Sequence, residues 1–284
     1  MEITEITYNE IRELFLTKRV REANKGDFGR VLIVAGSKGM AGAAILCAKG
    51  ALRAGAGLVT LSVPDELLQI VQTAVPEAMC ISRALTPEQL SVYDAVAAGP
   101  GLGASAETVE LVSYILENYG GRMVLDADAL NVLAGSGVTF DEDTVITPHP
   151  GEAARLLGVT ASVIQARREA SAAILAKKYG CAAVLKGAGT LVAVTQPRLE
   201  LYLNNTGNPG MATGGSGDVL TGVIASFIAQ GMPVLTAAKA GVYIHGFAGD
   251  MAAAVCGEAG LIAGDLPESI AMSLKKIAEP LNRH

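Results

Sequence analysis

The feature that most restricts the fold is an uninterrupted apolar run, Val31–Ala35, that passes directly into a glycine-containing loop at residues 36–44. A run without polar alternation is typical of a strand covered on both faces, as in parallel sheets. An alanine-rich segment follows the loop to about Arg53, and we predict that it is a helix. A strand, a glycine loop and a helix form the unit from which α/β proteins are built.

The same unit recurs along the chain, so we predict an α/β fold with a mostly parallel central sheet, helices on both faces and an antiparallel hairpin at one edge. The further strands are expected at residues 57–63, 93–98, 123–125, 144–146 and 183–187, with the hairpin at 191–194 and 199–204. The helices are expected at residues 7–23, 64–74 and 105–118, from 153, at 160–179, 219–230 and 234–255, and from 267. No linker or repeat divides the chain, so we predict a single domain over residues 1–284, with the helix at about 7–23 and the core at about 25–284.

Composition excludes several classes of function. Half of the 284 residues are hydrophobic and 33 are glycine, which suits a large core with many tight turns. The net charge is −6 without a basic cluster, so we expect no nucleic-acid partner. No apolar run reaches the roughly 20 residues of a membrane span, so we expect no membrane insertion. Phosphate recognition would therefore depend on backbone N–H groups and one or two lysines.

The cysteines indicate a reducing compartment. Cys47, Cys80, Cys181 and Cys256 stand singly without a CxxC pair, which predicts buried, reduced thiols in a cytoplasmic protein. Ligands for a structural zinc ion would be clustered, and none are. The N-terminus is mixed and charged, unlike a signal peptide.

The most informative loop is Gly207–Asp218, because it runs into the apolar, helix-patterned segment 219–232. A helix N-terminus offers free N–H groups and the positive end of the dipole to an anion. Glycines let the backbone approach a phosphate closely. Asp218 is delivered to the same place, where it would accept a proton from a hydroxyl that attacks a phosphoryl group. The alternative is that Asp218 only stabilises the helix dipole, by about 0.5 kcal/mol.

The loop at residues 36–44 has neither GxGxxG nor GxxxxGK[ST] spacing. It is either a non-standard phosphate cradle or a tight turn that lets the helix pack closely. The glycines of residues 99–103 follow a strand and suggest the wall of a cleft, because ligands of parallel sheets lie at the carboxyl ends of strands.

Other polar residues follow the ends of predicted strands. Asp126 and Asp128 either hold magnesium or a polar substrate, or one of them caps the next helix. His149 stands between two prolines in Thr147–Glu152, on a rigid corner that favours contact with a ligand.

Together these blocks resemble the ADP-dependent NAD(P)H-hydrate dehydratases of the ribokinase-like superfamily. The resemblance covers roughly residues 20–255, and its most specific blocks are TPHPGE and NPGMATGGSGD. The matching blocks, in chain order, are residues 25–29, 99–103, 126–131, 147–152, Lys186-Gly187 with Thr190, and 208–218. The resemblance implies a ribokinase-like three-layer sandwich.

The resemblance also implies a lyase reaction that repairs damaged cofactor. ADP would phosphorylate the ring hydroxyl of hydrated NADH or NADPH, with preference for the S epimer. Loss of phosphate would then restore the double bond and give NAD(P)H, AMP and phosphate. Mg²⁺ is expected to bind together with ADP. A companion epimerase is expected on a separate chain. We also expect a homo-oligomer, either a dimer or a homotetramer.

The family's functional residues carry over to matching positions. Asp218 would be the general base, and the N–H groups of Gly215, Ser216 and Gly217 would hold charge on the transferring phosphoryl group. The AMP moiety would lie against Lys186, Gly187, Ala188, Gly189, Thr190 and Gly217. The hydrated cofactor would meet Gly42, Ala43, Gly101, His149, Asn208 and Asp218. The metal ligands are unknown, with Glu152 as a candidate.

Two positions depart from the family pattern, and other functions stay open. Asn24 stands where histidine is common, and Ser216 where threonine is common. The main alternative is an ATP-dependent small-molecule kinase of the same superfamily, acting on a hydroxyethylthiazole or hydroxymethylpyrimidine. A nucleotide-binding module without catalysis and an assembly subunit with an inert pocket are the others.

Overall fold

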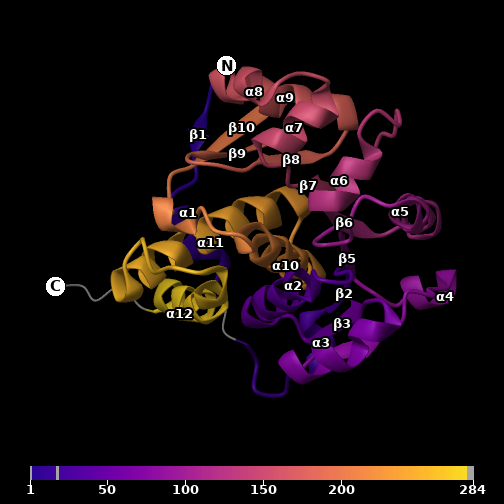
Figure 1. Cartoon of the computed structure of the whole chain (residues 1–284). Helices are drawn as coiled ribbons and strands as arrows, with labels where there is room; N and C mark the ends of the chain where they lie inside the picture. Colours follow the sequence, from indigo (N-terminus) through magenta and orange to yellow (C-terminus); the bar gives the residue numbers. More distant parts are fainter. Residues whose placement is uncertain (1, 17–18, 280–284) are drawn as a thin grey trace.

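The computed structural model describes residues 2–16 and 19–279, and their strands form one sheet (Figure 1). The strand order is β1-β10-β9-β8-β7-β6-β5-β2-β3-β4. All neighbours are parallel except that β9 is antiparallel to both β8 and β10. The strands are β1 Thr4–Glu5, β2 Arg30–Val34, β3 Leu58–Ser62, β4 Met79–Ile81, β5 Ala95–Ala98, β6 Arg122–Leu125, β7 Thr144–Ile146, β8 Ala182–Leu185, β9 Thr190–Val194 and β10 Glu200–Asn204.

Helices cover both faces of this sheet (Figure 1). One layer contains α1 Tyr8–Leu14, α2 Ala41–Arg53, α3 Leu68–Ala74, α10 Ser216–Ala229, α11 Val234–Cys256 and α12 Leu266–Ala278. The other contains α4 Pro87–Leu90, α5 Ala106–Asn118, α6 Ala127–Leu133, α7 Pro150–Leu157, α8 Ala161–Ala166 and α9 Arg168–Tyr179. The predicted architecture of a mostly parallel sheet with an antiparallel pair and helices on both faces is confirmed.

Strand β2 shows why the apolar runs lack alternation. Val31 and Ile33 point into the core under α2 and α10, whereas Leu32 and Val34 point into the core under α5 and α6. All four side chains are fully buried. Because both faces are covered, the strand is apolar from Val31 to Val34, and only its first residue, Arg30, is exposed.

Two glycines bring α2 and α10 together in the first layer. A Cβ at Gly222 would overlap the carbonyl of Cys47, and one at Gly50 would overlap the carbonyl of Val219. The backbones therefore approach more closely than other residues allow. This contact fixes the start of α10 relative to the sheet.

The first predicted helix is shorter than expected. The chain is helical only from Tyr8 to Leu14, and residues 17–18 lie outside the described part. Beyond them, Arg19 donates to the carbonyl of Gly55 at 2.7 Å and stacks 3.7 Å over the ring of Phe28. These tertiary contacts accompany a non-helical path of residues 19–23, in which Val20 is exposed.

The helix predicted at 160–179 is two helices that meet at Arg167, whose φ of −139° and ψ of 47° break the ladder. Arg168, the first residue of the second helix, directs its guanidinium to carbonyls at the end of β8 and in the turn that follows it. Helix α7 begins at Pro150 instead of Ala153, because His149 and Glu152 form a capping box. Helix α10 begins at Ser216, so Asp218 lies within its first turn.

Some short elements and one thiol also differ from expectation. Strands β1 and β4 are two and three residues long, too short for a periodic signal, and β1 lies outside the predicted edge hairpin. Cys47 and Cys181 are buried as predicted, but Cys80 is only half-buried and Cys256 is exposed near the end of α11. Helices of the described part of the chain are all too short or too polar to cross a bilayer.

Candidate functional site

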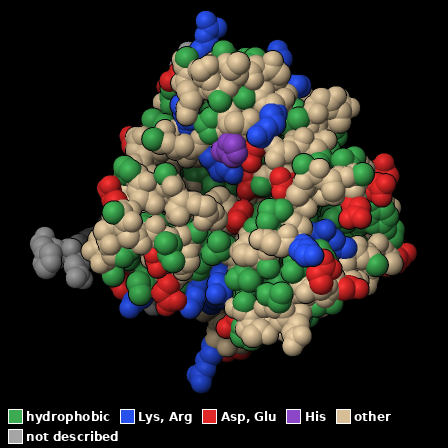
Figure 2. All heavy atoms as spheres, viewed as in Figure 1, with side chains coloured by type: hydrophobic (Ala, Val, Ile, Leu, Met, Phe, Trp, Pro, Cys, Tyr) green, Lys and Arg blue, Asp and Glu red, His purple; other side chains and the backbone are tan. Residues whose placement is uncertain are grey.

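The carboxyl ends of the parallel strands border a cavity of about 730 Å³. Three of its ionisable side chains follow strands: Asp126 directly after β6, Lys186 directly after β8, and His149 three residues beyond β7. On this face of the molecule, acidic, basic and histidine side chains gather around a central hollow (Figure 2). Since parallel strands end at one edge, the topology itself brings these separate residues together.

Helix α10 begins at the cavity with Gly215 as its N-cap, at a φ of +96° that favours glycine. Ser216 donates its N–H to the carbonyl of Thr213 at 3.4 Å. Among the described residues, the N–H groups of Gly217 and Asp218 have no acceptor. The first turn therefore presents two free donors and the positive end of a helix dipole.

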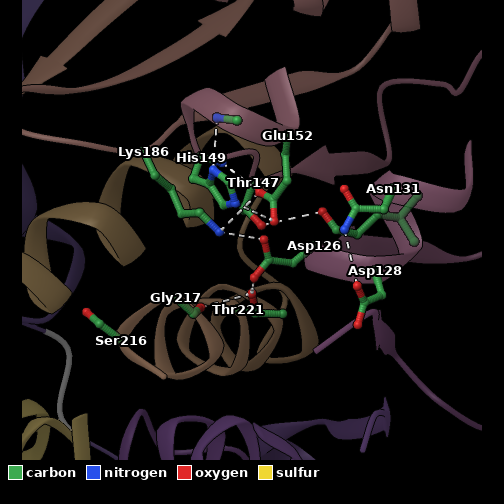
Figure 3. Close-up of polar contacts among 12 residues, drawn as sticks. Asp126, Asp128, Asn131, Thr147, His149, Glu152, Lys186, Ser216, Gly217 and Thr221 are labelled. Carbon is green, nitrogen blue, oxygen red and sulfur yellow. Dashed lines mark hydrogen bonds and ion pairs between the residues drawn. The ribbon is translucent and has the colours of Figure 1, made fainter. Parts of the chain in front are cut away.

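Lys186 lies over this first turn. A Cβ at Gly217 would come within 3.1 Å of the lysine Nζ, so the ammonium lies close to the backbone of this turn. Nζ is 2.6 Å from Asp126 Oδ1 and 3.9 Å from Glu152 Oε2 (Figure 3). Burial by itself lowers the pKa of Lys186, but the two carboxylates outweigh it and the pKa is raised. The lysine is charged, and its side chain is 17% exposed toward the cavity.

Asp126 is buried beneath the lysine and anchors it. Its Oδ2 accepts a hydrogen bond from the Thr221 hydroxyl of α10 at 2.8 Å, so one carboxylate joins Lys186 to this helix. Although Asp126 precedes α6, its side chain makes no capping hydrogen bond there. Asp128 accepts from the N–H of Gly103 at 2.7 Å and from Asn131 at 3.1 Å.

The pKa of Asp218 lies far above that of an ordinary aspartate. Burial, followed by the charge of Asp126, raises the pKa of Asp218 to about 7, against a smaller lowering by Lys186. A carboxyl group with this pKa exchanges protons readily near neutral pH, as a general base must. It lines the cavity beside the free N–H groups of α10.

His149 and Glu152 form a rigid pair on the opposite wall. The Nδ1 of His149 accepts from Gly151 N–H at 2.9 Å, and Nε2 lies 3.2 Å from Glu152 Oε1. Glu152 Oε2 accepts the His149 N–H at 2.7 Å. Burial is the main reason that the pKa of Glu152 rises to about 7 and that the pKa of His149 is lowered.

The cavity offers only a partial set of protein ligands for the Mg²⁺ that the resemblance implies. Over residues 2–16 and 19–279, no three His, Cys, Asp or Glu side chains are grouped as a metal site requires. Asp126 and Glu152 both already face Lys186. A protein cage is thus lacking, although Mg²⁺ commonly binds through one or two carboxylates together with substrate phosphates.

The turn of residues 186–190 is held by Arg168, which the sequence analysis did not single out. Its guanidinium donates to the carbonyls of Leu185 at 3.1 Å, Lys186 at 3.2 Å and Gly189 at 3.1 Å. Gly187 has a φ of +139°, and a Cβ there would come within 2.8 Å of Arg168 Nη1. Arg168 lies inside the predicted helix 160–179, and nothing in the sequence linked it to a turn so far along the chain.

The predicted site residues separate into two groups. Those that line the cavity are His149, Glu152, Lys186, Gly187, Ala188, Gly189, Thr190, Asn208, Ser216, Gly217 and Asp218. Gly215 packs against Leu46 and Ala263 instead. Gly42, Ala43 and Gly101 are not part of the cavity lining.

Ala43, in the first turn of α2, lies next to Gly101, in the loop that follows β5. A Cβ on Gly101 would lie 2.8 Å from that of Ala43, and Gly101 has a φ of +62°. Asp128 connects this region to the cavity, because it binds the Gly103 N–H and its charge also raises the pKa of Asp218. Asn24, at the departure from the family pattern, caps the 3₁₀ turn at residues 25–28 through Gly26 N–H at 2.9 Å.

A general base, free helix N–H groups and a fixed ammonium around one cavity can transfer a phosphoryl group to a hydroxyl. The fold agrees with this chemistry: a ribokinase-like superfamily protein from Enterococcus faecalis superposes with a TM-score of 0.88 and 28% identity, over 98% of this chain and 97% of that one. The chain is therefore a protein of the ribokinase-like fold.

More specific relatives narrow the family. The sequence profile described as NAD(P)H-hydrate dehydratase matches residues 31–272. An ADP-dependent (S)-NAD(P)H-hydrate dehydratase from Neisseria meningitidis is 41% identical over 256 residues, 87% of this chain and 86% of its own length. The chain belongs to the NAD(P)H-hydrate dehydratase family.

A solved structure and a longer relative complete the comparison. The ADP/ATP-dependent NAD(P)H-hydrate dehydratase from Bacillus subtilis, co-crystallised with ATP and Mg²⁺, has a TM-score of 0.87 and 30% identity, covering 98% of this chain and 99% of that one. A bifunctional NAD(P)H-hydrate repair enzyme from Moorella thermoacetica is 44% identical over 280 residues, 93% of this chain and 52% of its own length. The chain therefore spans about half the length of the bifunctional relatives it matches.

Proposed function

We propose that this protein is an ADP-dependent NAD(P)H-hydrate dehydratase, a carbon–oxygen lyase that acts on the S epimer of hydrated NADH or NADPH. The observation that carries the proposal is the position of Asp218, whose pKa is raised to about 7 by burial, in the first turn of α10 beside free N–H groups. The products are NAD(P)H, AMP and phosphate.

The reaction has two stages, and the first uses Asp218 as the base. Its carboxylate takes the proton of the ring hydroxyl, whose oxygen bonds to the β-phosphorus of ADP while AMP leaves. The free N–H groups of Gly217 and Asp218, with the ammonium of Lys186, stabilise the negative charge on the phosphoryl group. In the second stage the ring loses this phosphate and a proton, which restores the double bond.

The nucleotide and the cofactor approach the phosphoryl group from different sides. The AMP moiety lies along the turn of residues 186–190, whose shape Arg168 maintains. The hydrated ring lies toward Gly42, Ala43 and Gly101, on the side of Asp218 that Asp128 links to the Gly103 loop. His149 borders the cavity between the turn and α7.

Mg²⁺ enters with the phosphates of ADP. When bound it supplies positive charge that neutralises the phosphate oxygens and orients them. Glu152 is the candidate among the cavity carboxylates for contact with the metal or its water, although Lys186 and His149 compete for its oxygens.

The biological setting follows from the same proposal. Residues 1–284 act as one catalytic domain, since the described strands form one sheet. A companion epimerase activity would convert the other epimer of the hydrate into the S epimer that this reaction consumes. We further propose that the protein is a homo-oligomer, and light scattering should first test for a tetramer. We also propose that it acts in the cytoplasm, where its four free thiols stay reduced.

One assay separates this function from the superfamily kinase. The protein is incubated with ADP and chemically hydrated NADH, and the absorbance band of reduced nicotinamide is followed. Recovery of the band with release of AMP and phosphate supports the dehydratase. No recovery, together with formation of a phosphate ester from ATP and hydroxyethylthiazole or hydroxymethylpyrimidine, would identify the kinase instead.

A further inference from the structure

Helix α11 holds the beginning of loop 207–218 through one carboxylate. Asp250 Oδ2 accepts the Gly207 N–H at 2.9 Å, and Oδ1 accepts from Asn208 Nδ2 at 3.0 Å. Asn208 in turn holds the next part of the loop, because its Oδ1 accepts the N–H of Gly210 at 3.0 Å. Asp250 thus makes two of these three hydrogen bonds, and Asn208 extends the chain of bonds to Gly210.

The same helix contacts the middle and the end of the loop. A Cβ at Gly249 would overlap the Met211 side chain, so the loop packs directly on the α11 backbone. At the far end, His245 Nε2 lies 2.9 Å from the carbonyl of Ser216. Burial lowers the pKa of His245 to about 4, so the neutral ring donates its Nε2–H to this carbonyl.

These contacts matter because the loop determines the direction of the free N–H groups in α10. Gly207 has a φ of +103°, and the loop has no strand or long helix of its own between β10 and α10. Hydrogen bonds to a charged carboxylate are shorter and stronger than those between neutral groups. Fixed donors lose no freedom when a phosphate binds, and this preorganisation increases affinity.

We propose that Asp250 is a positioning residue for the nucleotide phosphates: it latches Gly207 and Asn208 so that α10 meets ADP in a preformed shape. Asp250 acts through the loop without touching the reacting atoms, and Asn208 belongs to the latch. The inference rests on the proposed function, in which this loop binds the phosphates of ADP.

A swap of the two side chains tests the latch. Asp250→Asn places two amide donors face to face, and Asn208→Asp places two carboxylates face to face, so each change weakens ADP binding about 10-fold or more. The double variant N208D/D250N restores every bond with the partners exchanged. Calorimetric titration with ADP should show that the double variant recovers most of the lost affinity.

The matched control is Asp94→Asn, which alters a carboxylate that accepts a backbone N–H, that of Arg30 at 2.7 Å, at the amino ends of the strands. D94N and D250N should lower the melting temperature by similar amounts, but only D250N should weaken ADP binding. Equal ADP affinity in these two variants, or losses that simply add in the double variant, would overturn the proposal.

A second variant, Asp250→Glu, tests the latch if D250N does not fold, and direct measurement of ADP binding tests it independently of dehydratase activity. Asp250→Glu retains the charge but displaces the loop, so it should bind ADP less tightly even if D250N does not fold. Wild-type affinity for ADP in D250E would contradict the latch. If the wild-type protein binds ADP but leaves hydrated NADH unchanged, the dehydratase function fails while the swap still tests the latch.

Discussion

Two glycine loops lead into two helices that pack against each other, yet only the start of α10 combines an acid in its own first turn with a largely buried lysine above it. Loop 36–44 enters α2, whose N-cap is Met40 and whose first turn has no acid. Loop 207–218 enters α10, whose first turn contains Asp218 and lies under Lys186. Backbone N–H groups and glycines are common to both. Under the proposed function, Asp218 and Lys186 make the start of α10 the place for phosphoryl chemistry, and the start of α2 is left for the uncharged ring.

The largest expected effect is at Asp218. Asp218→Asn keeps the size of the side chain but removes the base, so kcat should fall by about 10²–10⁴-fold, the usual contribution of general-base catalysis. ADP should still bind, because the free N–H groups and Lys186 are unchanged. Steady-state kinetics and ADP titration measure the two quantities, and equal loss of both would favour a binding module over an enzyme.

Lys186→Met tests the charge above α10. The change leaves Asp126 buried without its cation, which costs on the order of 3 kcal/mol of stability, and removes an ammonium from the phosphates. We expect ADP affinity and the melting temperature to fall together.

The control for this change is Lys239→Met, because Lys239 is also largely buried and ion-paired, with Glu10 on α1. It should lower the melting temperature alone. Unchanged ADP affinity in Lys186→Met would remove the lysine from the phosphate site and weaken the contrast between the two loops.

The sequence predicted the fold well wherever a feature was local. Apolar runs marked the inner strands because burial on both faces removes alternation, and the glycine block identified the start of α10 to within three residues. The residues that shape the site from a distance were missed. Arg168 and Asp250 act on turns that lie 17 to 21 and 42 to 43 residues away along the chain, and no periodicity or motif reports such contacts.

The pH dependence follows from the raised pKa of Asp218. Burial shifts this pKa from 3.8 to about 7, and the base must be ionised, so kcat/KM should fall about 10-fold per pH unit below 7. The free energy of unfolding changes with pH in the opposite direction to kcat/KM. Below pH 4 both states hold the proton, and the folded state loses relative stability as pH rises through 7.

Asp218→Asn removes this stability loss, so the variant should melt at a higher temperature than wild type at pH 8, with little difference at pH 4. Melting curves at the two pH values provide the check. A variant that is less stable than wild type at pH 8 would mean that the carboxylate is not penalised by burial.

The smallest effect should separate the two loops most sharply. At Gly217 an added Cβ lies 3.1 Å from Lys186 Nζ, so in Gly217→Ala the ammonium must shift by a few tenths of an ångström, which should weaken ADP binding several-fold.

At Gly42 an added Cβ meets open space, and alanine favours a helix over glycine by up to about 1 kcal/mol, so Gly42→Ala should melt slightly higher. If loop 36–44 faces the cofactor ring, the new methyl group occupies that space: the KM for hydrated NADH rises several-fold while ADP affinity stays at the wild-type value. The reverse pattern, with ADP weakened and the cofactor KM unchanged, would assign loop 36–44 to phosphate as well. The two helix starts would then differ in degree and not in kind.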